Sequence, residues 1–159
     1  MTGSSRMRND LRSARASISW LALIVVLLFA DDAGAATKVG PFGVWLTRAG
    51  DARVHLSQCG SGICGKIVWL KQPIDSATGQ PQTDDKNSDP SLKKRPIIGL
   101  PLFVGMQPSA SNAWSGQIYN ADDGRHYSST ITQIDPAQLE VRGCAGALCG
   151  SEIWTRAPR

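Results

Sequence analysis

The chain has 159 residues, a formal net charge of +4 and 19% charged residues. A chain of this length is expected to form one domain, with at most a short additional segment. The positive charge is mild and does not concentrate into a long basic run. It therefore argues against a nucleic acid as partner.

The N-terminus has the three parts of a secretory signal. Four arginines precede an apolar run at residues 18–30, and Ala33-Gly-Ala35 follows as a cleavage site. The apolar run is shorter than the roughly 17–25 residues that cross a bilayer, so an uncleaved anchor is the weaker alternative. We predict a signal peptide at 1–35 and one mature domain at 36–159. The mature protein would be periplasmic or secreted, with no stable membrane insertion and a net charge of +3.

All four cysteines lie in the predicted mature domain, where an exported protein meets an oxidising compartment. Four cysteines allow three pairings. We favour Cys59–Cys64 and Cys144–Cys149, because each pair closes its own glycine-containing loop. Each bridge is expected to stabilise the fold by about 2 kcal/mol. A zinc site made of the four thiolates is the alternative.

Short apolar alternations rich in β-branched residues predict about eight strands. In chain order they are 43–47, 53–57, 66–70, 97–106, 113–119, 126–132, 139–143 and 152–156. Pairing 53–58 with 65–70 places a four-residue connection between Cys59 and Cys64. The close spacing of the strands predicts an antiparallel barrel or sandwich with almost no helix.

Residues 71–96 interrupt this pattern with prolines, glycine and charged side chains. A structureless connection of this length is improbable inside a domain. Asp89 supplies a helix cap, Pro90 a first helical residue, and Lys93 and Lys94 a basic last turn. We therefore predict one short helical turn within 71–96.

Six separated motifs in the chain resemble those of the DUF2147 family. They are Gly43-Val-Trp45, Cys64-Gly-Lys-Ile-Val-Trp-Leu70, Asp85-Lys-Asn-Ser-Asp-Pro90, Arg95-Pro96 with Gly99, Gly116-Gln-Ile-Tyr119 with Asp123-Gly124, and Trp154-Thr-Arg156. The resemblance covers residues 40–157, with Ser88 standing where the family often has proline. These are exported bacterial proteins of unknown function, related to lipocalins and other calycin-type barrels. The resemblance therefore implies a small up-and-down barrel and supplies no catalytic residues.

A looser resemblance connects the chain to the lipocalins themselves. Their hallmark is a G-x-W on the first strand, whose tryptophan packs near an arginine or lysine of the last strand. Gly43, Trp45 and Arg156 occupy the corresponding places here. The resemblance implies that the indole plugs the closed end of the barrel and that the guanidinium stacks on its face.

Catalytic and metal motifs are weak in this sequence. His55 and His126 lie on different predicted strands, no nucleophile motif accompanies them, and solvated histidines are the better interpretation. The spacing of Asp85, Asn87 and Asp89 imitates a calcium loop, but prolines stand where that loop needs glycine and glutamate. We predict a non-enzymatic protein without catalytic residues, metal or cofactor.

The function therefore depends on what occupies the interior of the barrel. An eight-stranded barrel is just wide enough to be filled by side chains or to hold one small ligand. Eight residues are candidates for ligand contact or for the core: Trp45, Trp69, Phe103, Met106, Trp114, Tyr119, Tyr127 and Arg156. We predict binding of a small apolar or amphipathic molecule. The alternative is a cell-envelope interaction or structural module with a filled barrel.

Overall fold

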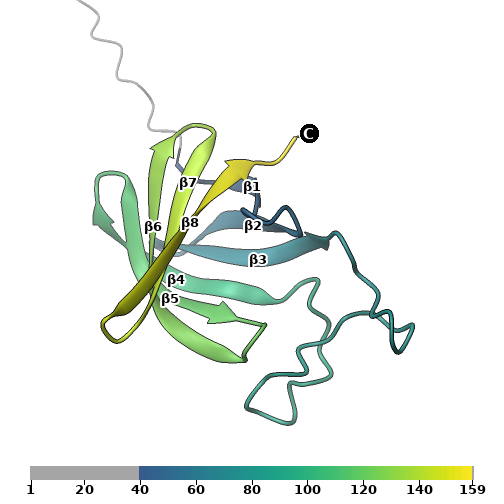
Figure 1. The fold of residues 1–159 in the computed structure, drawn as a ribbon. Coiled ribbons are helices and arrows are strands. Elements are labelled where there is room, and N and C mark those ends of the chain that lie inside the picture. The colour runs from purple at the N-terminus through teal and green to yellow at the C-terminus, as the bar shows by residue number, and fades with distance from the viewer. Residues whose placement is uncertain (1–39, 159) are drawn as a thin grey trace, which may run out of the picture. The chain divides into compact units, whose positions relative to one another are not determined.

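Eight antiparallel strands follow one another around a closed barrel in a computed structural model that describes residues 40–158 (Figure 1). The strands are β1 (Gly43–Leu46), β2 (Ala52–Cys59), β3 (Gly62–Leu70), β4 (Pro101–Ala110), β5 (Ala113–Asn120), β6 (Arg125–Asp135), β7 (Gln138–Ala145) and β8 (Leu148–Arg156). The predicted antiparallel up-and-down barrel is confirmed. The predicted signal peptide lies outside the described residues.

The connections alternate between the two ends of the barrel. The β2–β3, β4–β5 and β6–β7 turns lie at one end with residues 40–42, and we call this the closed end. The β1–β2 turn, residues 71–100, the β5–β6 turn and the β7–β8 turn lie at the other, which we call the open end. The two cysteine hairpins thus lie at opposite ends of the barrel, although their sequences are similar.

Residues 71–100, which we call the excursion, join β3 to β4 through turns. Two isolated bridges, Ile74↔Pro81 and Thr83↔Pro96, fold the excursion back on itself. Where a short helical turn was predicted, the chain forms hydrogen-bonded turns and no helix. Leu92 N–H, for example, donates to the Asp89 carbonyl at 3.1 Å. Residues 97–100 belong to the excursion, so β4 begins later than its apolar run suggests.

The closed half of the barrel is filled by large side chains from alternating strand positions. Trp45, Leu56, Phe103 and Met106 are each 0% exposed, and Trp154 is 2% exposed. The rings of Phe103 and Trp154 meet at 5.9 Å between centroids, tilted by 57°. Aromatic burial of this kind is the largest favourable contribution that such side chains make to folding.

The seam that closes the barrel depends on Trp45 and Arg156. Strands β1 and β8 pair in only two registered positions, Trp45↔Arg156 and Leu46↔Thr155. The Arg156 guanidinium lies 4.2 Å from the Trp45 ring centroid and donates to the Phe42 carbonyl at 3.0 Å. The indole N–H donates to the Pro41 carbonyl at 2.7 Å. The lipocalin-like plug implied by the sequence is present.

Gly43 is required at this seam. Its φ is +120°, and a Cβ built there would lie 2.7 Å from Arg156 Nη1. A side chain would therefore strain the backbone and displace the guanidinium. This steric conflict explains why glycine precedes Trp45 by two residues.

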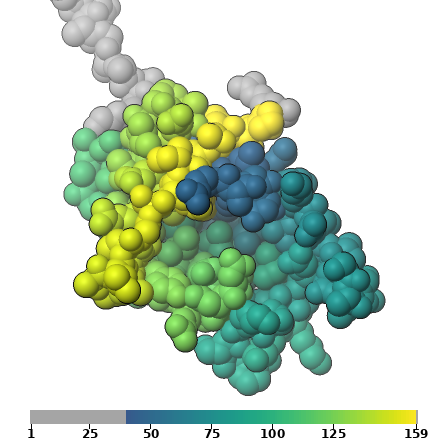
Figure 2. Space-filling view, viewed as in Figure 1, coloured from purple at the N-terminus to yellow at the C-terminus, as the bar shows by residue number. Residues whose placement is uncertain are grey.

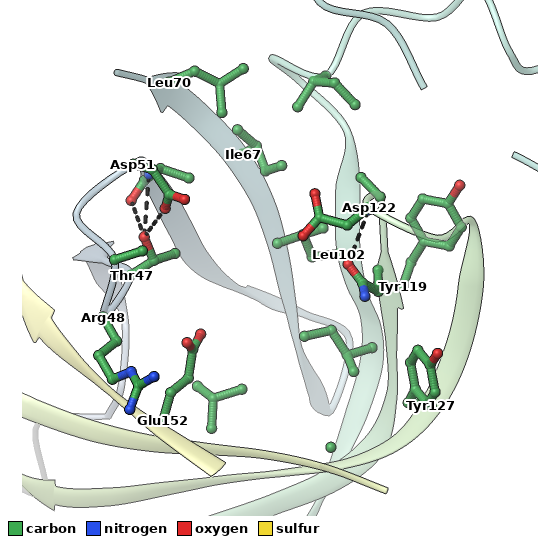
Figure 3. Close-up of a pocket in the computed structure, with 18 of the residues that line it drawn as sticks. Thr47, Arg48, Asp51, Ile67, Leu70, Leu102, Tyr119, Asp122, Tyr127 and Glu152 are labelled. Carbon is green, nitrogen blue, oxygen red and sulfur yellow. Dashed lines mark hydrogen bonds between the residues drawn. The ribbon is translucent and has the colours of Figure 1, made fainter. Parts of the chain in front are cut away.

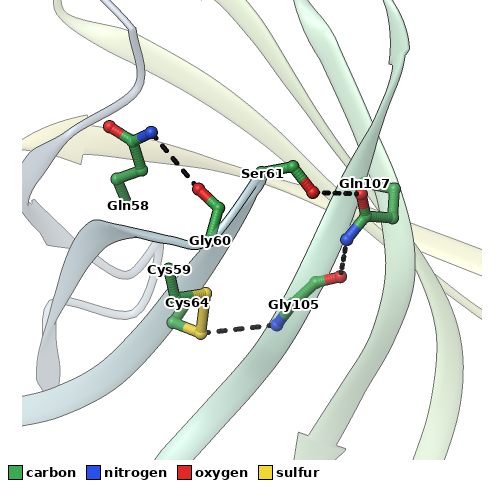
Figure 4. Close-up of a disulfide and its surroundings, with 7 residues drawn as sticks. All are labelled: Gln58, Cys59, Gly60, Ser61, Cys64, Gly105 and Gln107. Carbon is green, nitrogen blue, oxygen red and sulfur yellow. Dashed lines mark hydrogen bonds between the residues drawn. A yellow bond between two sulfur atoms is a disulfide. The ribbon is translucent and has the colours of Figure 1, made fainter.

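Both favoured disulfides are present. Cys59–Cys64 has a Cα separation of 5.7 Å and Cys144–Cys149 one of 4.1 Å. The first hairpin differs from expectation, because its strands run to Cys59 and from Gly62, leaving a two-residue connection. Figure 4 shows the surroundings of this bridge, where Gly105 N–H donates to Cys64 Sγ at 3.4 Å. Within the second hairpin, Cys144 and Cys149 face each other directly.

Replacing Trp45 with alanine should destabilise the protein by about 3–5 kcal/mol, because the plug leaves a cavity that the seam cannot fill. Chemical denaturation measures the effect. Trp69→Ala is the matched control, since Trp69 is 36% exposed; its loss should be about 1 kcal/mol. Equal effects of the two variants would contradict the role of Trp45.

Mass spectrometry of the non-reduced protein after alkylation should find no free thiol, because all four cysteines are paired. Removing either bridge as a Cys→Ser pair should lower the free energy of unfolding by about 2 kcal/mol. Four alkylated cysteines in the purified, non-reduced protein would contradict the bridges.

Candidate functional site

A cavity of about 1100 Å³ occupies the open half of the barrel. The space-filling view shows a hollow bordered by the segments around the β1–β2 turn, the β5–β6 turn and the β7–β8 hairpin (Figure 2). The excursion supplies a further part of its lining. Ligand pockets have volumes of about 300–1,000 Å³, so this cavity has the size of a binding site for a small molecule.

Most side chains on the walls and floor of the cavity are apolar. Seven side chains from five strands and the excursion provide this surface: Ile67, Leu70, Ile97, Leu102, Ile118, Val141 and Trp154. Several of them project from the surrounding strands toward the same space (Figure 3). Trp154 belongs both to this lining and to the buried core, so it forms the floor between the filled and the hollow half.

The mouth of the cavity carries charged and polar side chains of both signs. Its basic residues are Arg48, Lys71 and Lys86, and its acidic residues Asp51, Asp85 and Asp122. Asp51 accepts a hydrogen bond from Thr47 Oγ1 at 2.6 Å, and Asp85 pairs with Lys86 at 3.0 Å. Apolar walls beneath a mixed polar rim suit an amphipathic molecule.

Two glycines keep one wall of the cavity open. Gly143 on β7 and Gly150 on β8 are direct ladder partners and both line the cavity. A Cβ built on Gly150 meets no atom within 4 Å, and one on Gly143 meets only Ile118 and Tyr127, at 3.9 and 4.0 Å. Neither position needs glycine for its backbone conformation or for close packing. The absence of a side chain at both positions therefore leaves space in the cavity unfilled.

A buried polar cluster attaches the excursion to the outside of the barrel. Asp84 is 0% exposed and accepts hydrogen bonds from the Tyr119 hydroxyl at 2.6 Å and the Asn87 amide at 2.7 Å. Arg95 Nε donates to the same carboxylate at 2.8 Å, and its guanidinium lies over the Tyr119 ring, 5.4 Å from the centroid. Tyr119 projects outward from β5 beside His126, with ring centroids 5.0 Å apart. We call these four residues, Asp84, Asn87, Arg95 and Tyr119, the clamp.

Electrostatics couple the members of the clamp. Burial acts to raise the pKa of Asp84, but hydrogen bonds from Tyr119, Asn87 and Arg95, together with the Arg95 charge, outweigh it and lower that pKa below 3.8. Burial and the Asp84 carboxylate raise the pKa of Tyr119 above 10.0. Asp84 is therefore ionised and Tyr119 neutral across the physiological pH range.

Close backbone packing supports the clamp. Gly124, in the β5–β6 turn, has a φ of +72°, and a Cβ there would overlap the Lys86 carbonyl oxygen. The excursion thus lies directly against this turn. A small outer groove of about 410 Å³, lined in part by Leu92, Val104 and His126, marks the same junction.

The eight predicted interior residues separate into several places. Trp45, Phe103 and Met106 are buried core, Trp114 packs partly buried against it, and Arg156 lies at the seam. Tyr127 lines the cavity. Its hydroxyl donates to Asp123.

Two of these residues have positions that sequence alone did not resolve. Tyr119 is held in the clamp, although it also contributes to the mouth. Trp69 contradicts the expectation, since it lies on the outer face beneath Arg53, 4.9 Å from its ring centroid. A register shift between Arg53 and Val54 accompanies this turn of the strand.

Sequence reasoning missed Glu152, the glycine pair and Asp84. The period-2 alternation of β8 contains a signal for two of them: once Trp154 faces inward, Glu152 and Gly150 must do so as well. Asp84 carried no such signal, because its partner Tyr119 is 35 residues away and reaches it only when the excursion folds back on β5.

The fold and the cavity define a lipocalin-like barrel that is open at one end. Its structure is similar to that of a protein from the human pathogen Helicobacter pylori that belongs to the lipocalin family. The TM-score is 0.61 at 17% sequence identity, with 73% of this chain and 82% of that chain covered. At this identity the similarity is one of fold.

Residues 43–156 match the model of a family described as "Uncharacterized protein conserved in bacteria (DUF2147)". The chain belongs to this family, as its motifs predict. No curated protein matches the chain. Several of the motifs, among them Asp85–Pro90, Arg95, Tyr119 and Gly124, meet where the excursion packs on the β5–β6 hairpin.

Clusters of metal ligands and membrane-spanning helices are both absent from the part of the chain that the structure describes. Among residues 40–158, no three His, Cys, Asp or Glu side chains gather as metal ligands. No helix in the same range is long and apolar enough to cross a membrane.

Replacing Asp84 with asparagine should lower the free energy of unfolding by about 3 kcal/mol at pH 7, because Arg95 and Tyr119 lose a buried anionic acceptor. The figure is at the low end for a buried pair because the Arg95 side chain is 32% exposed. Denaturation measures it, with the exposed neighbour Asp85→Asn as the control that should change little.

The same variant tests the pKa direction. Because the folded-state pKa of Asp84 is lowered, its contribution is fully present above the unfolded-state pKa of about 3.9 and is lost as pH falls through the folded-state value. The stability gap between wild type and Asp84→Asn should therefore shrink below about pH 4. A gap that stays constant down to pH 2 would contradict the assignment.

Proposed function

We propose that this protein is an exported, non-enzymatic binding protein that holds a small apolar or amphipathic molecule in the open half of its barrel. One observation carries the proposal: a cavity of about 1100 Å³ with largely apolar walls opens at one end of an otherwise filled barrel. Transfer of apolar ligand surface from water into such a cavity is favourable by about 25 cal/mol per Å².

The closed barrel holds the walls of the cavity in fixed positions. Closure by β1 and β8 leaves no free sheet edge, and the disulfide Cys144–Cys149 constrains the hairpin that borders the mouth. The clamp holds the excursion at the same end. A preformed site of this kind binds without a large cost of ordering its own walls.

A non-enzymatic role is supported by where the reactive groups lie. His55 pairs with Lys66 on the outer side of β2, and His126 stacks on Tyr119 outside the barrel. The buried carboxylate of Asp84 is occupied by three donors. The cysteines are paired, so none supplies a thiolate nucleophile.

Export to the periplasm, or secretion, is part of the proposal. Two disulfides are typical of proteins that fold in an oxidising compartment, and the sequence of residues 1–35 has the pattern of a secretory signal. The alternative interaction module was predicted for a barrel filled throughout. Because side chains fill only the closed half of the barrel, the structure favours the binding protein over the interaction module.

Binding of the neutral apolar fluorophore N-phenyl-1-naphthylamine tests the proposal. Wild type should enhance and saturate its fluorescence, while the double variant Gly143→Leu/Gly150→Leu should bind at least tenfold more weakly, because the added side chains enter the cavity. Thr155→Leu adds an apolar group at an exposed position of β8 and is the matched control.

Denaturation curves of both variants establish that they are folded before binding is compared. Retained binding in the folded double variant would place the fluorophore outside the cavity and contradict the proposal. So would the absence of saturable binding to wild type.

A further inference from the structure

Glu152 places a carboxylate inside the cavity. It lies on the inward face of β8, two residues from the buried Trp154 and directly opposite Val141, which is 4% exposed. Figure 3 shows its side chain rising from the β8 side toward the cavity. The other acidic lining residues come from the turns and the excursion at the mouth, so Glu152 stands apart from them on the barrel wall.

The Glu152 carboxylate has hydrogen-bonding capacity left over. The Trp154 indole N–H donates to Oε1 and fixes the side chain. Among residues 40–158 the ion pairs join Lys86 to Asp85 and Arg95 to Asp84, and neither includes Glu152. An ionised carboxylate accepts up to about four hydrogen bonds, so this group can still receive a donor from the cavity side.

The surroundings make such a donor favourable. Val141, Ile67 and Ile118 give the adjacent walls an apolar surface, and a charge–donor interaction is stronger there than in bulk water. Arg48 also lines the cavity, but it belongs to the exposed β1–β2 turn and makes no salt bridge with Glu152. A bound molecule with a cationic donor would use the remaining hydrogen-bonding capacity of the half-buried Glu152 carboxylate. An anionic head group would be repelled by the same carboxylate.

We propose that Glu152 is the polar anchor of the cavity and that the ligand presents a protonated amine to it, with its apolar body along the Ile67, Ile118 and Val141 walls. This inference rests on the proposed function and deepens it by naming the ligand's chemical class. The ligand is thus a cationic amphiphile, bound with its amine toward the barrel floor.

Paired dansyl probes test this assignment on the full mature protein. Dansylcadaverine carries a protonated amine, and a dansyl amino acid of similar chain length carries a carboxylate in its place. Wild type should bind the amine probe at least tenfold more tightly. Glu152→Gln should remove that preference by weakening the amine probe about tenfold, because glutamine keeps an acceptor for Trp154 while losing the charge.

A matched control exists in Glu140→Gln. Glu140 lies on the outward face of β7 and pairs with Ile153, so its neutralisation should leave both probes unchanged. N-phenyl-1-naphthylamine, which has no charge, should bind wild type and Glu152→Gln equally. This neutral probe separates loss of the anchor from loss of the cavity.

Each outcome decides a different question. Equal binding of the two dansyl probes, or an unchanged preference in Glu152→Gln, overturns the anchor while neutral-probe binding leaves the proposed function standing. If Glu140→Gln weakened binding of the amine probe as much as Glu152→Gln, the effect would come from net charge alone, and this would also overturn the anchor. Failure of all three probes to bind wild type overturns both proposals.

Discussion

The barrel depends on the contact between Trp45 and Arg156. The seam between β1 and β8 is short, with two registered pairs, so backbone hydrogen bonds alone would close it weakly. The guanidinium compensates by stacking on the indole and by donating to the carbonyls of Pro136 at 2.7 Å and Phe42 at 3.0 Å. First and last strands are thereby joined to the β6–β7 turn, and the space at this end is taken up by the plug.

Filling one end has a consequence for the other. The large core side chains lie from the plug to Trp154, and beyond them β7 and β8 present Val141, Gly143 and Gly150 to the interior. Side chains too small to meet across the barrel leave a hollow whose walls are held from outside, by the clamp on the excursion and by the disulfide in the β7–β8 hairpin. Stability and the binding cavity are therefore located in different halves of one barrel.

Local sequence patterns predicted the strands, their antiparallel order and the two disulfides, while the Gly43–Trp45–Arg156 plug was implied by the resemblance to lipocalins. The strands and the disulfides depend on neighbours in sequence, on period-2 alternation or on a short motif. The clamp was not predicted, because Asp84 and Tyr119 lie on separate elements whose contact requires the folded excursion. The position of Trp69 differs from its prediction. The alternation predicts that this aromatic residue faces inward, but it lies on the outer face, and a register shift near Arg53 accompanies that position. The Glu152 carboxylate followed from alternation only after Trp154 was known to face inward.

The most direct measurement is a crystal structure of the protein purified from its native envelope without denaturation. Electron density for one small molecule in the open half, in contact with Val141 and with a nitrogen within hydrogen-bonding distance of Glu152, is the predicted result. Side chains closed over the space between Trp154 and the mouth, leaving no room for a ligand, would contradict the account of this barrel as a binding protein.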